Sequence, residues 1–556
     1  MKVLIVGGVA GGASAAARLR RLDEKAEIII FERGEFISFA NCGLPYHIGG
    51  VIESRSDLVL QTPQSFKSRF NIDVRTFSLV TGIDTDKKCV SVKDLKSGAV
   101  YTESYDSLIL STGAEPVRPP VPGADGDKVF TLRTIPDTLR IKQFIADCAP
   151  KSAVIVGGGY IGVEMAENLA FAGLDVAIVE RADHLVAPLD YDIAVDLHHY
   201  IRSKGVKLVL NNGLAEIKEE GGQLAVMLEH GQLEADFVIM AVGVKPDTAL
   251  AREAGLALNA RGCILVDEAC KTSQPDIYAV GDAVEVVDFV SGQKSFVPLA
   301  GPANRQGRIA ADAICGLKSR YGGTQGSSIL KVFDMTVACT GLSEASARKA
   351  GIDCDKVFLY AGSHAGYYPG ATNMSVKVLF ERGSGRLLGA QFAGYDGVDK
   401  RCDVMATAIR LGATAYDLTE LELCYAPPYS SAKDPVNMAG FAIQNVLDGL
   451  VDSFHWHDVD DLPRDGSVTL LDVRTPGETA RGMIDGFIAI PLDNLRAQLH
   501  ELNKDKPIYV HCQSGLRSYI ACRILVGNGF KCYNLSGGYR LYNSIKRARE
   551  MEIQHG

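Results

Sequence analysis

A unit made of a strand, a glycine-rich turn, a helix and a second strand occurs twice in this sequence. In the first copy the expected strands are 3–6 and 27–32, and the turn runs from Gly7 to Gly12. Such glycines let the backbone approach a pyrophosphate, whose charge is held at the helix N-terminus, while an acid such as Glu32 accepts a hydrogen bond from a ribose hydroxyl. Val9 occupies the third place of the usual GxGxxG pattern, and a glycine turn can also be purely structural, so this copy alone is a weak signal.

The second copy has every glycine of the pattern. Its strands are expected at 153–156 and 176–180, its turn runs from Gly157 to Gly162, and its helix covers 163–173. Recurrence of the unit carries more weight than either copy, so the sequence predicts two bound dinucleotides. Glu180 closes the second unit and favours NADH, because a carboxylate binds the ribose diol and repels a 2′-phosphate, although the neighbouring Arg181 leaves NADPH possible.

Two further strands lead into glycine turns, 108–110 before Thr112 and Gly113, and 277–280 before Gly281 and Asp282. With these four motifs in order, residues 1–445 resemble the flavoprotein disulfide reductases that bind two dinucleotides. The resemblance implies FAD on the first fold and NADH or NADPH on the second, with the Gly-Asp pair at the flavin ribityl chain. The implied cofactor-binding residues are Gly7, Gly8, Ala10, Gly11, Gly12, Glu32, Arg33, Thr112, Gly113, Gly281 and Asp282 for FAD, and Gly157, Gly159, Tyr160, Ile161, Gly162, Glu180 and Gly243 for the nicotinamide dinucleotide.

Composition limits the remaining functions. The 556 residues are 47% hydrophobic and 22% charged with a net charge of -9, which is typical of folded proteins and argues against a nucleic-acid partner. No apolar run approaches the roughly 18 residues of a membrane span, and the first strand begins directly after Met1, leaving no room for a signal peptide. We therefore expect a cytoplasmic protein.

The thirteen cysteines are scattered singly without any CxxC pair, which weighs against a zinc site and a secreted disulfide framework. Most are expected to be reduced, buried, small hydrophobic side chains. The triplet from His455 to His457 lacks a nearby cysteine or third histidine, so we expect a polar interdomain segment there and no metal.

Cys42 differs from the other cysteines because Asn41, Gly43 and Pro45 around it indicate a loop or helix start, where amides and the helix dipole favour a thiolate. No second cysteine follows within several residues. The segment resembles the single-cysteine branch of the family, in particular coenzyme A disulfide reductases and NADH-dependent persulfide reductases. That branch also contains oxidases and peroxidases, but the peroxidases use an early histidine, and no histidine precedes His47.

The resemblance also implies a coenzyme A site and a homodimer. The matching substrate positions are Arg18, Arg21, Ser38, Asn41, Asn304 and Arg308. Without the resemblance, Arg18, Arg20 and Arg21 would indicate a solvated helix face. Two tyrosines, Tyr367 and Tyr425, are expected to reach the cysteine of the partner subunit, and Tyr367 is chosen over Tyr368 only by alignment with the family. On sequence alone each tyrosine could equally be a core or interface aromatic.

A last α/β unit contains the segments 471–478, 510–518 and 534–538, which resemble a rhodanese domain. The expected strand 508–511 ends at Cys512, and a tight loop would then turn its amides toward the sulfur before the next helix. Arg517 would add positive charge that stabilises a thiolate or persulfide. The loop is as short as in sulfur-transferring rhodaneses and shorter than in the related phosphatases.

The expected fold class is α/β, with two dinucleotide-binding folds, an α+β dimerisation domain and a C-terminal rhodanese-like domain. The expected boundaries are 1–115 and 251–322 for the FAD domain, 116–250 for the NAD(P)H domain, 323–447 for dimerisation, 448–465 for a linker and 466–556 for the rhodanese domain.

The fusion favours a reductase of coenzyme A persulfide or polysulfide in which Cys512 delivers sulfane sulfur and Cys42 forms a mixed disulfide with coenzyme A. Reduction of coenzyme A disulfide is the alternative enzyme activity. A sulfur carrier or redox sensor is the alternative of another class.

Overall fold

The computed structural model describes residues 1–555. The chain divides into two compact units, which we describe separately. The first contains Met1–Arg181, Gly205–Lys207 and Asn212–Gly326, and the second contains Ala182–Lys204, Leu208–Asn211 and the chain from Ser327 onward.

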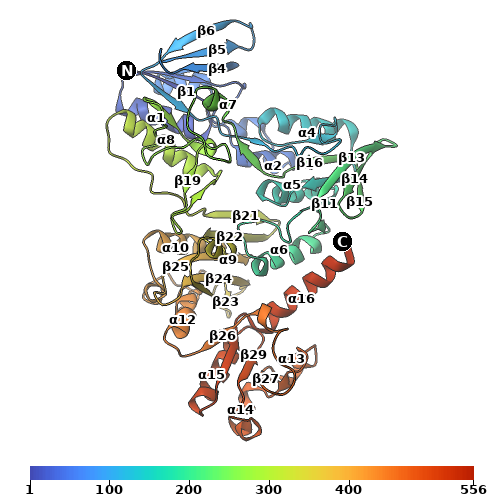
Figure 1. Ribbon diagram of the computed structural model, residues 1–556. Coiled ribbons are helices and arrows are strands. Elements are labelled where there is room, and N and C mark those ends of the chain that lie inside the picture. Colours follow the sequence, from blue (N-terminus) through green and yellow to red (C-terminus); the bar gives the residue numbers. More distant parts are fainter. Residues whose placement is uncertain (556) are drawn as a thin grey trace. The chain divides into compact units, whose positions relative to one another are not determined.

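A parallel five-stranded sheet organises the beginning of the first unit, with the strand order β18-β7-β1-β2-β3. Its strands are β1 (Lys2–Val6), β2 (Glu27–Phe31), β3 (Asp73–Arg75), β7 (Ser107–Leu110) and β18 (Ile277–Ala279). Val3 and Ile5 enter one apolar cluster and Leu4 enters another, so both faces of β1 are buried, as expected for a parallel sheet. Helices α1 (Ala10–Leu22) and α8 (Ala300–Ile314) pack together beside this sheet (Figure 1).

The same unit contains a second parallel sheet, in which β11, β10, β16 and β9 follow one another. These strands are β9 (Val129–Phe130), β10 (Ser152–Val156), β11 (Asp175–Val179) and β16 (Phe237–Met240). Helix α5 (Tyr160–Phe171) follows β10 directly, and α4 (Ile135–Cys148) precedes it. Thr134 and Asp137 form a capping box that satisfies amides at the start of α4.

Two small antiparallel sheets complete the first unit. Their strands are β4 (Ser78–Asp84), β5 (Cys89–Asp94) and β6 (Val100–Ser104) in one, and β13 (Leu214–Glu220), β14 (Gln223–Leu228) and β15 (Gln232–Ala235) in the other. A two-stranded pair joins β8 (Ala114–Pro116) to β17 (Val244–Pro246).

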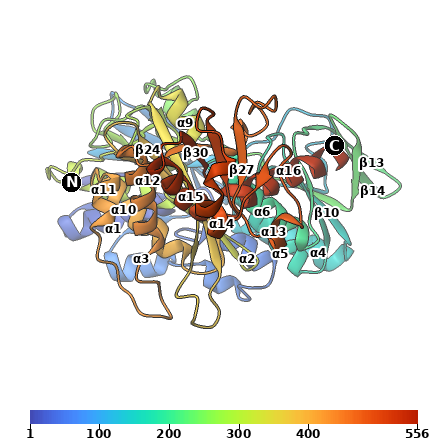
Figure 2. The same ribbon diagram turned by 90° about the horizontal axis from the view of Figure 1, so that it is seen from below.

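The second unit is built around an antiparallel sheet with the order β21-β22-β25-β24-β23. Its strands are β21 (Ser328–Val332), β22 (Met335–Gly341), β23 (Cys354–Gly362), β24 (Asn373–Glu381) and β25 (Leu387–Gly394). Helices α10 (Val398–Arg410) and α12 (Pro435–Leu447) pack against one another beside it (Figures 1 and 2). Pro435 at the first position and the Asp434 carboxylate, which accepts from the Val436 amide, start α12.

Residues 452–555, which we call the C-terminal module, form a parallel sheet with the order β26-β30-β29-β27-β28. The strands are β26 (Asp452–Phe454), β27 (Thr469–Asp472), β28 (Ile488–Ala489), β29 (Ile508–His511) and β30 (Cys532–Leu535), and the main helices are α13 (Pro476–Thr479), α14 (Leu492–Gln498), α15 (Leu516–Gly527) and α16 (Gly538–His555). The segment expected as a linker contains strand β26. Its backbone pairs with β30, so this part of the segment belongs to the sheet of the module.

Helix α6 (Tyr191–Ser203) also belongs to the second unit and contacts β22, β24, β25 and α16. In the described residues no helix is both long and apolar enough to cross a membrane. All thirteen cysteines lie in the described part and carry free thiols; seven are buried, whereas Cys42, Cys148 and Cys424 are exposed.

Candidate functional site

The first glycine turn brings a strand and a helix into close contact. Gly7 has φ +98°, and a Cβ on Gly12 would stand 1.9 Å from the Gly7 carbonyl oxygen, so no side chain fits there. The amide of Gly8 donates to the Glu32 carboxylate over 3.0 Å, and the Gly34 amide donates to its other oxygen over 2.8 Å. The turn therefore presents the N-terminus of α1 beside an acid, the arrangement that suits a dinucleotide.

The second turn repeats this geometry. Gly157 has φ +111°, and a Cβ on Gly162 would again stand 1.9 Å from a carbonyl oxygen, that of Gly157. The Gly158 amide donates to the Glu180 carboxylate over 2.6 Å. Tyr160 begins α5 and Ile161 is partly exposed beside it. Equivalent distances in two copies indicate two binding sites of one type.

The other cofactor positions also lie in the first unit. Gly113, Gly243 and Gly281 all have positive φ, and the Gly281 amide donates to Gln306 over 2.7 Å. The Thr112 hydroxyl donates to the Asp247 carbonyl over 2.5 Å, while Arg33 forms an ion pair with the Asp247 carboxylate at 3.1 Å. Burial raises the pKa of Asp282, which the charge of Arg133 partly offsets.

Cys42 lies in the short 3-10 helix η1 (Asn41–Gly43), directly before helix α2 (Leu44–Ile48). Its thiol is exposed, but the protein around it removes enough water to raise its pKa, and the charges of Glu164 and Asp282 raise it further. The sequence predicted that the helix start would lower the pKa of Cys42 and favour its thiolate, but the surrounding protein raises this pKa. The main physical reason is burial of the thiol, and the charges of Glu164 and Asp282 add to it.

Sequence reasoning missed Glu164, whose charge raises the pKa of this cysteine. Glu164 lies on α5, and Tyr46 on α2 donates to it over 3.4 Å. Burial raises the pKa of Glu164 to about 7, and Glu167 adds to the shift, whereas the hydrogen bond from Tyr46 opposes it. No spacing in the sequence connects α2 with α5, because their contact is purely tertiary.

The three arginines of α1 lie in different surroundings. Arg20 is 5% exposed and donates to backbone carbonyls including those of Ala26, Phe70 and Asn71, so a solvated face is the wrong interpretation for it. Arg18 pairs with Asp312 of α8 at 2.6 Å. Arg20 is therefore structural.

The other positions predicted to bind substrate differ in their exposure and in their hydrogen bonds. Arg21 of α1 and Arg308 of α8 are exposed, and Ser14 joins the two helices through its hydrogen bond to Asn304 at 2.5 Å. Ser38 has φ +44°, and the amide oxygen of Asn41 is buried without a hydrogen-bond partner in the described residues. An unfilled acceptor beside Cys42 is consistent with a ligand there.

Tyr367 and Tyr425 belong to the second unit, and the structure brings them together. Their hydroxyls lie 3.0 Å apart, although 58 residues separate them in the sequence. They are 76% and 50% exposed, so neither is a core residue. The hydrogen bond from Tyr425 raises the pKa of Tyr367. Tyr368 instead packs its ring against His364.

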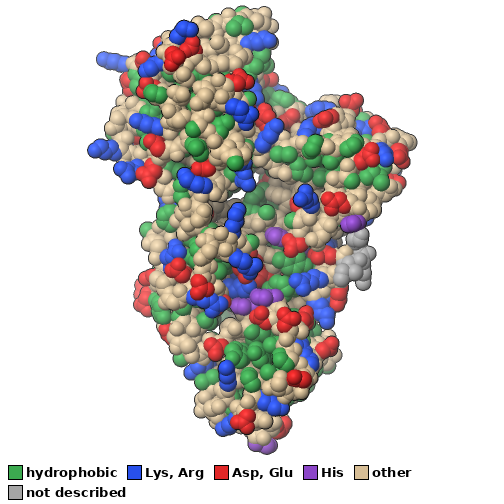
Figure 3. All heavy atoms as spheres, in the orientation of Figure 1, with side chains coloured by type: hydrophobic (Ala, Val, Ile, Leu, Met, Phe, Trp, Pro, Cys, Tyr) green, Lys and Arg blue, Asp and Glu red, His purple; other side chains and the backbone are tan. Residues whose placement is uncertain are grey.

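Cys512 follows β29, as the sequence predicts, and its loop turns toward the sulfur. The Gly515 amide donates to Sγ over 3.1 Å and the Ser518 hydroxyl donates over 3.3 Å. Cys512 is fully buried, whereas Leu516, which begins α15, is 57% exposed. Figure 3 shows hydrophobic side chains gathered on the visible face of the module, over the region where Figure 1 labels β27 and β29.

Arg517 lies beside this loop but is already paired. Its guanidinium donates twice to Glu478, over 2.8 Å and 2.6 Å. This paired contact, with the Thr475 hydrogen bonds, lowers the pKa of Glu478 to about 2. The positive charge expected at Cys512 is therefore offset by Glu478, a partner 39 residues away that the sequence does not reveal.

A buried pair behind the loop was also missed. Asp472 and Arg474 are almost fully buried and bound to each other at 2.7 Å, and the Arg474 guanidinium lies 3.8 Å from the centre of the Tyr539 ring. Burial lowers the pKa of His511 to about 4 although its Nε2 lies 3.5 Å from Asp472. His511 is therefore neutral at physiological pH.

One group of carboxylates in the described residues has the spacing of metal ligands, namely Asp190, Asp192 and Glu344. The ammonium of Lys377 lies among them, at 3.0 Å from Asp190 and 2.7 Å from Asp192. This lysine supplies the positive charge that a cation would bring. Within the expected polar triplet, His455 stacks on His457 and its Nε2 lies 3.3 Å from Asp355.

Comparison with protein families assigns nearly the whole chain. Residues 1–307 match the pyridine nucleotide-disulphide oxidoreductase model, and residues 327–435 match the dimerisation domain of the same group. Residues 455–544 match a rhodanese-like domain. These matches confirm the α/β fold class and both resemblances.

Two solved structures cover almost the whole chain, and a further relative covers 80% of it. The crystal structure of reduced CoADR-RHD from Bacillus anthracis is 50% identical, covers 99% of this chain and 98% of its own, and has a TM-score of 0.97. The NAD-dependent persulfide reductase from A. fulgidus is 36% identical, covers 98% and 100%, and has a TM-score of 0.91. The coenzyme A disulfide reductase of Staphylococcus haemolyticus is 37% identical over 446 residues, which are 80% of this chain and 100% of that protein. The chain therefore belongs to the pyridine nucleotide-disulphide oxidoreductase family of flavoprotein enzymes and carries a rhodanese-like domain.

Proposed function

We propose that this enzyme uses NADH to reduce the sulfur-sulfur bond of coenzyme A persulfide, or of a polysulfide, at Cys42. Cys512 delivers sulfane sulfur to that reaction. The observation that carries the proposal is the presence of two free thiols in different surroundings in one chain. Cys42 is exposed in the unit with two dinucleotide turns, and Cys512 is held by amide and hydroxyl donors in a rhodanese-like loop.

The first fold fits FAD, since the Gly7–Gly12 turn excludes side chains and Glu32 stands at the turn as an acceptor. Bound FAD supplies a two-electron relay between a nicotinamide and sulfur. The second fold fits NADH, because Glu180 offers a carboxylate where a 2′-phosphate would have to lie. Gly113, Gly281 and Asp282 complete the first site.

Cys42 performs the sulfur step. Its thiolate attacks the coenzyme-side sulfur of the persulfide, the sulfur-sulfur bond breaks, and hydrosulfide leaves with the electron pair. A Cys42-coenzyme A mixed disulfide forms. Two electrons and one proton then restore the Cys42 thiolate and release coenzyme A as the thiol, so that one NADH is consumed for each hydrosulfide.

The residues around Cys42 bind and orient the substrate. Arg18, Arg21 and Arg308 provide guanidinium groups suited to the phosphates of coenzyme A, with Ser38, Asn41 and Asn304 as hydrogen-bonding groups. In the homodimer, Tyr367 and Tyr425 of the other subunit protonate or position the sulfur atoms. Their hydroxyls, 3.0 Å apart, form a pair that can pass a proton.

Cys512 receives sulfane sulfur as a persulfide. The Gly515 amide and the Ser518 hydroxyl donate to Sγ and stabilise the thiolate that attacks the donor sulfur, by charge-assisted hydrogen bonds. Arg517 positions the loop through its paired contact with Glu478 and adds little net charge.

NADH oxidation measured together with hydrosulfide release tests the proposal. We expect turnover with coenzyme A persulfide to exceed turnover with oxygen or peroxide, with one hydrosulfide per NADH. Higher catalytic efficiency with coenzyme A disulfide would favour the alternative enzyme activity. Absence of turnover with either substrate would favour a sulfur carrier or redox sensor.

Cys42→Ser and Cys148→Ser form a matched pair, because both thiols are exposed and only the first has a proposed role. Cys42→Ser should retain FAD but lose NADH-linked reduction, since a hydroxyl does not replace a thiolate in exchange. Cys148→Ser should behave as the wild type. Equal activity of the two variants would refute the role of Cys42.

A further inference from the structure

The edge of the antiparallel sheet is covered by the C-terminal module. In the described sheet β23 pairs only with β24, so alternate backbone groups of β23 point away from the sheet. One of them, the Phe358 amide, donates to the Ser536 hydroxyl over 2.9 Å in a buried contact. An exposed sheet edge is an aggregation hazard, so the module also protects it.

The loop that contains Ser536 touches the Cys512 loop on its other side. A Cβ on Gly537 would stand 3.2 Å from the Phe358 ring, whereas a Cβ on Gly538 would stand 2.7 Å from the Cys512 carbonyl oxygen. A single layer of backbone therefore separates the edge strand from the sulfur-binding loop. A side chain at Gly537 would press on the Phe358 ring, and one at Gly538 would press on the Cys512 loop.

Arg540 joins the same two surfaces. Its amide donates to the Gln513 carbonyl over 2.9 Å, and the preceding Tyr539 amide donates to the Cys512 carbonyl over 2.8 Å. Its guanidinium lies 4.1 Å from the centre of the Tyr360 ring on β23. The backbone of Arg540 thus holds the Cys512 loop, and its side chain holds the sheet.

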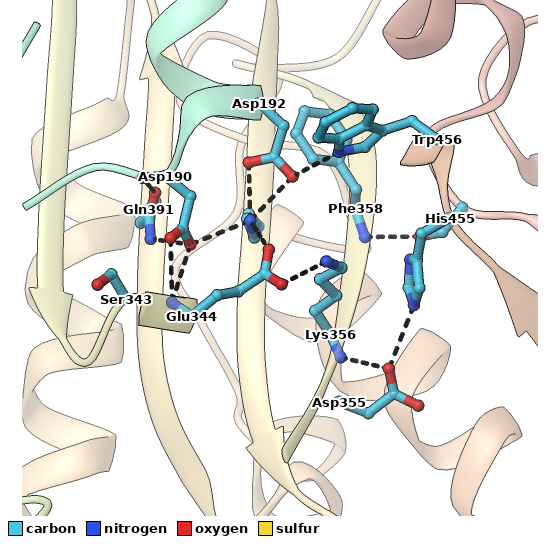
Figure 4. A network of polar contacts seen from close by, with 12 residues as sticks. Asp190, Asp192, Ser343, Glu344, Asp355, Lys356, Phe358, Gln391, His455 and Trp456 are labelled. Atoms are coloured by element: carbon cyan, nitrogen blue, oxygen red, sulfur yellow. Dashed lines mark hydrogen bonds and ion pairs between the residues drawn. The ribbon is translucent and has the colours of Figure 1, made fainter. Parts of the chain in front are cut away.

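Further contacts join the module to the rest of the second unit. The Trp456 indole donates to Asp192 over 3.3 Å, and His455 lies 3.3 Å from Asp355 (Figure 4). Asp192 in turn binds the fully buried Lys377 at 2.7 Å. Trp456 is therefore attached to a charge network in the core of the sheet.

Helix α16 adds a contact with α6. The Tyr191 hydroxyl donates to Glu552 over 3.2 Å, and the Arg549 guanidinium lies 4.9 Å from the centre of the Trp456 ring. His199 lies 3.0 Å from the Ser544 carbonyl oxygen. The module therefore has a fixed position against the sheet and α6.

We propose that strand β23 positions the sulfur-transfer loop, with Ser536 and Arg540 as positioning residues. The chemistry of Cys512 then depends on the contacts of the module with β23. This inference rests on the proposed role of Cys512 as a sulfur carrier. The Gly515 amide and the Ser518 hydroxyl reach Sγ only while the loop keeps its shape. A displaced loop lengthens these bonds, which weakens the stabilisation of the thiolate and of the persulfide.

Ser536→Ala, Ser536→Thr and the control Ser467→Ala test the inference in the full-length holoenzyme. Ser467 is an exposed serine of the same module with only a local bond to Asp465. Ser536→Ala leaves the buried Phe358 amide without its acceptor, so kcat for sulfur transfer from thiosulfate to a thiol should fall about tenfold, with KM little changed. Ser536→Thr, which keeps the hydroxyl, should stay within about twofold of the wild type. Ser467→Ala should not change.

A second readout follows the thiol itself. The alkylation rate of Cys512, measured by mass spectrometry as a function of pH, should reach half its maximum at a higher pH in Ser536→Ala. Arg540→Ala should show the same two changes, whereas Arg547→Ala, an exposed arginine of the same helix, should show neither. If Ser536→Ala does not fold, the comparison of Arg540→Ala with Arg547→Ala still tests the inference. NADH turnover at Cys42 with coenzyme A disulfide should be unchanged in all variants.

The inference is overturned if Ser536→Ala and Arg540→Ala lower thermal stability but leave the alkylation profile and sulfur transfer unchanged. Both residues would then be structural only. If instead the wild type transfers no sulfur and equals Cys512→Ser, the proposed function of Cys512 fails. The alkylation profile would still decide whether β23 positions the loop.

Discussion

Replacement of Lys377 by methionine tests the charge network most directly. The lysine side chain is completely buried and binds Asp190 at 3.0 Å and Asp192 at 2.7 Å, with a third contact to Glu344. Methionine fills a similar volume but leaves these carboxylates without their central cation. Removal of one partner from a buried ion pair costs about 3–5 kcal/mol of the free energy of unfolding.

The pKa of Glu344 gives a second measure of the same interaction. Burial by itself raises this pKa, but the charges of Lys377 and Lys356 outweigh burial and lower it from 4.5 to about 2. At 1.36 kcal/mol for each pKa unit, the shift corresponds to about 3 kcal/mol of stability at neutral pH. Part of this shift comes from Lys356, so the loss of about 3–5 kcal/mol for an unpaired buried charge sets the expected effect, a fall in Tm of roughly 10 °C at about 2–4 °C for each kcal/mol.

The pH dependence has a definite sign. In the wild type, the contribution of Glu344 is present above its unfolded pKa of 4.5 and is lost as the pH falls toward about 2. In Lys377→Met, the carboxylates repel one another without this cation, and the folded-state pKa values of Asp190 and Glu344 rise. Their protonation then relieves the repulsion, so the Tm difference between wild type and variant should shrink as the pH is lowered from 7 to 4.

Fluorescence of Trp456 provides the assay, because it is the only tryptophan of the chain and binds Asp192. Lys204→Met is the matched control; its lysine is exposed and pairs with Asp334, so water replaces the lost contact and the change should be much smaller. An unchanged Tm in Lys377→Met, or a difference that grows on acidification, would refute the reasoning.

Three further predictions concern the cofactor and substrate positions. Gly162→Ala should raise KM for NADH more than tenfold, because the new Cβ would stand 1.9 Å from the Gly157 carbonyl oxygen; KM within about twofold of the wild type in steady-state kinetics would contradict this. Glu180→Ala should raise the catalytic efficiency with NADPH relative to NADH about tenfold, since a carboxylate no longer repels the 2′-phosphate, and an unchanged ratio would count against the nicotinamide assignment. Tyr425→Phe should lower kcat severalfold without altering the dimer in size-exclusion chromatography, because only the hydroxyl bonded to Tyr367 is removed, and normal turnover would make Tyr425 a packing residue.

Local pattern predicted the elements that carry the site. The first strand was expected at 3–6 and the strand before Cys512 at 508–511, and the structure has β1 at Lys2–Val6 and β29 at Ile508–His511. Both are short apolar runs that end at a glycine turn or a tight loop, so backbone chemistry alone delimits them. The two dinucleotide turns were found for the same reason.

Partnerships between distant residues escaped the sequence. Arg20 looks like its neighbours on α1 but is buried, because backbone carbonyls from Ala26 to Asn71 surround its guanidinium. Arg517 has a charge that Glu478 offsets from 39 residues away. Glu164 raises the pKa of the Cys42 thiol from another helix.

Local sequence patterns predicted the two glycine turns, the positions of Cys42 and Cys512 after their strands or turns, and the order of the domains, because each of these depends on neighbouring residues and on backbone geometry. The tertiary structure alone decided which charges oppose the thiolate of Cys42, that Tyr367 and Tyr425 meet, and that Ser536 ties the Cys512 loop to β23. Electrostatic shifts and buried hydrogen bonds depend on distances of a few ångströms between segments far apart in the chain, and only packing fixes those distances.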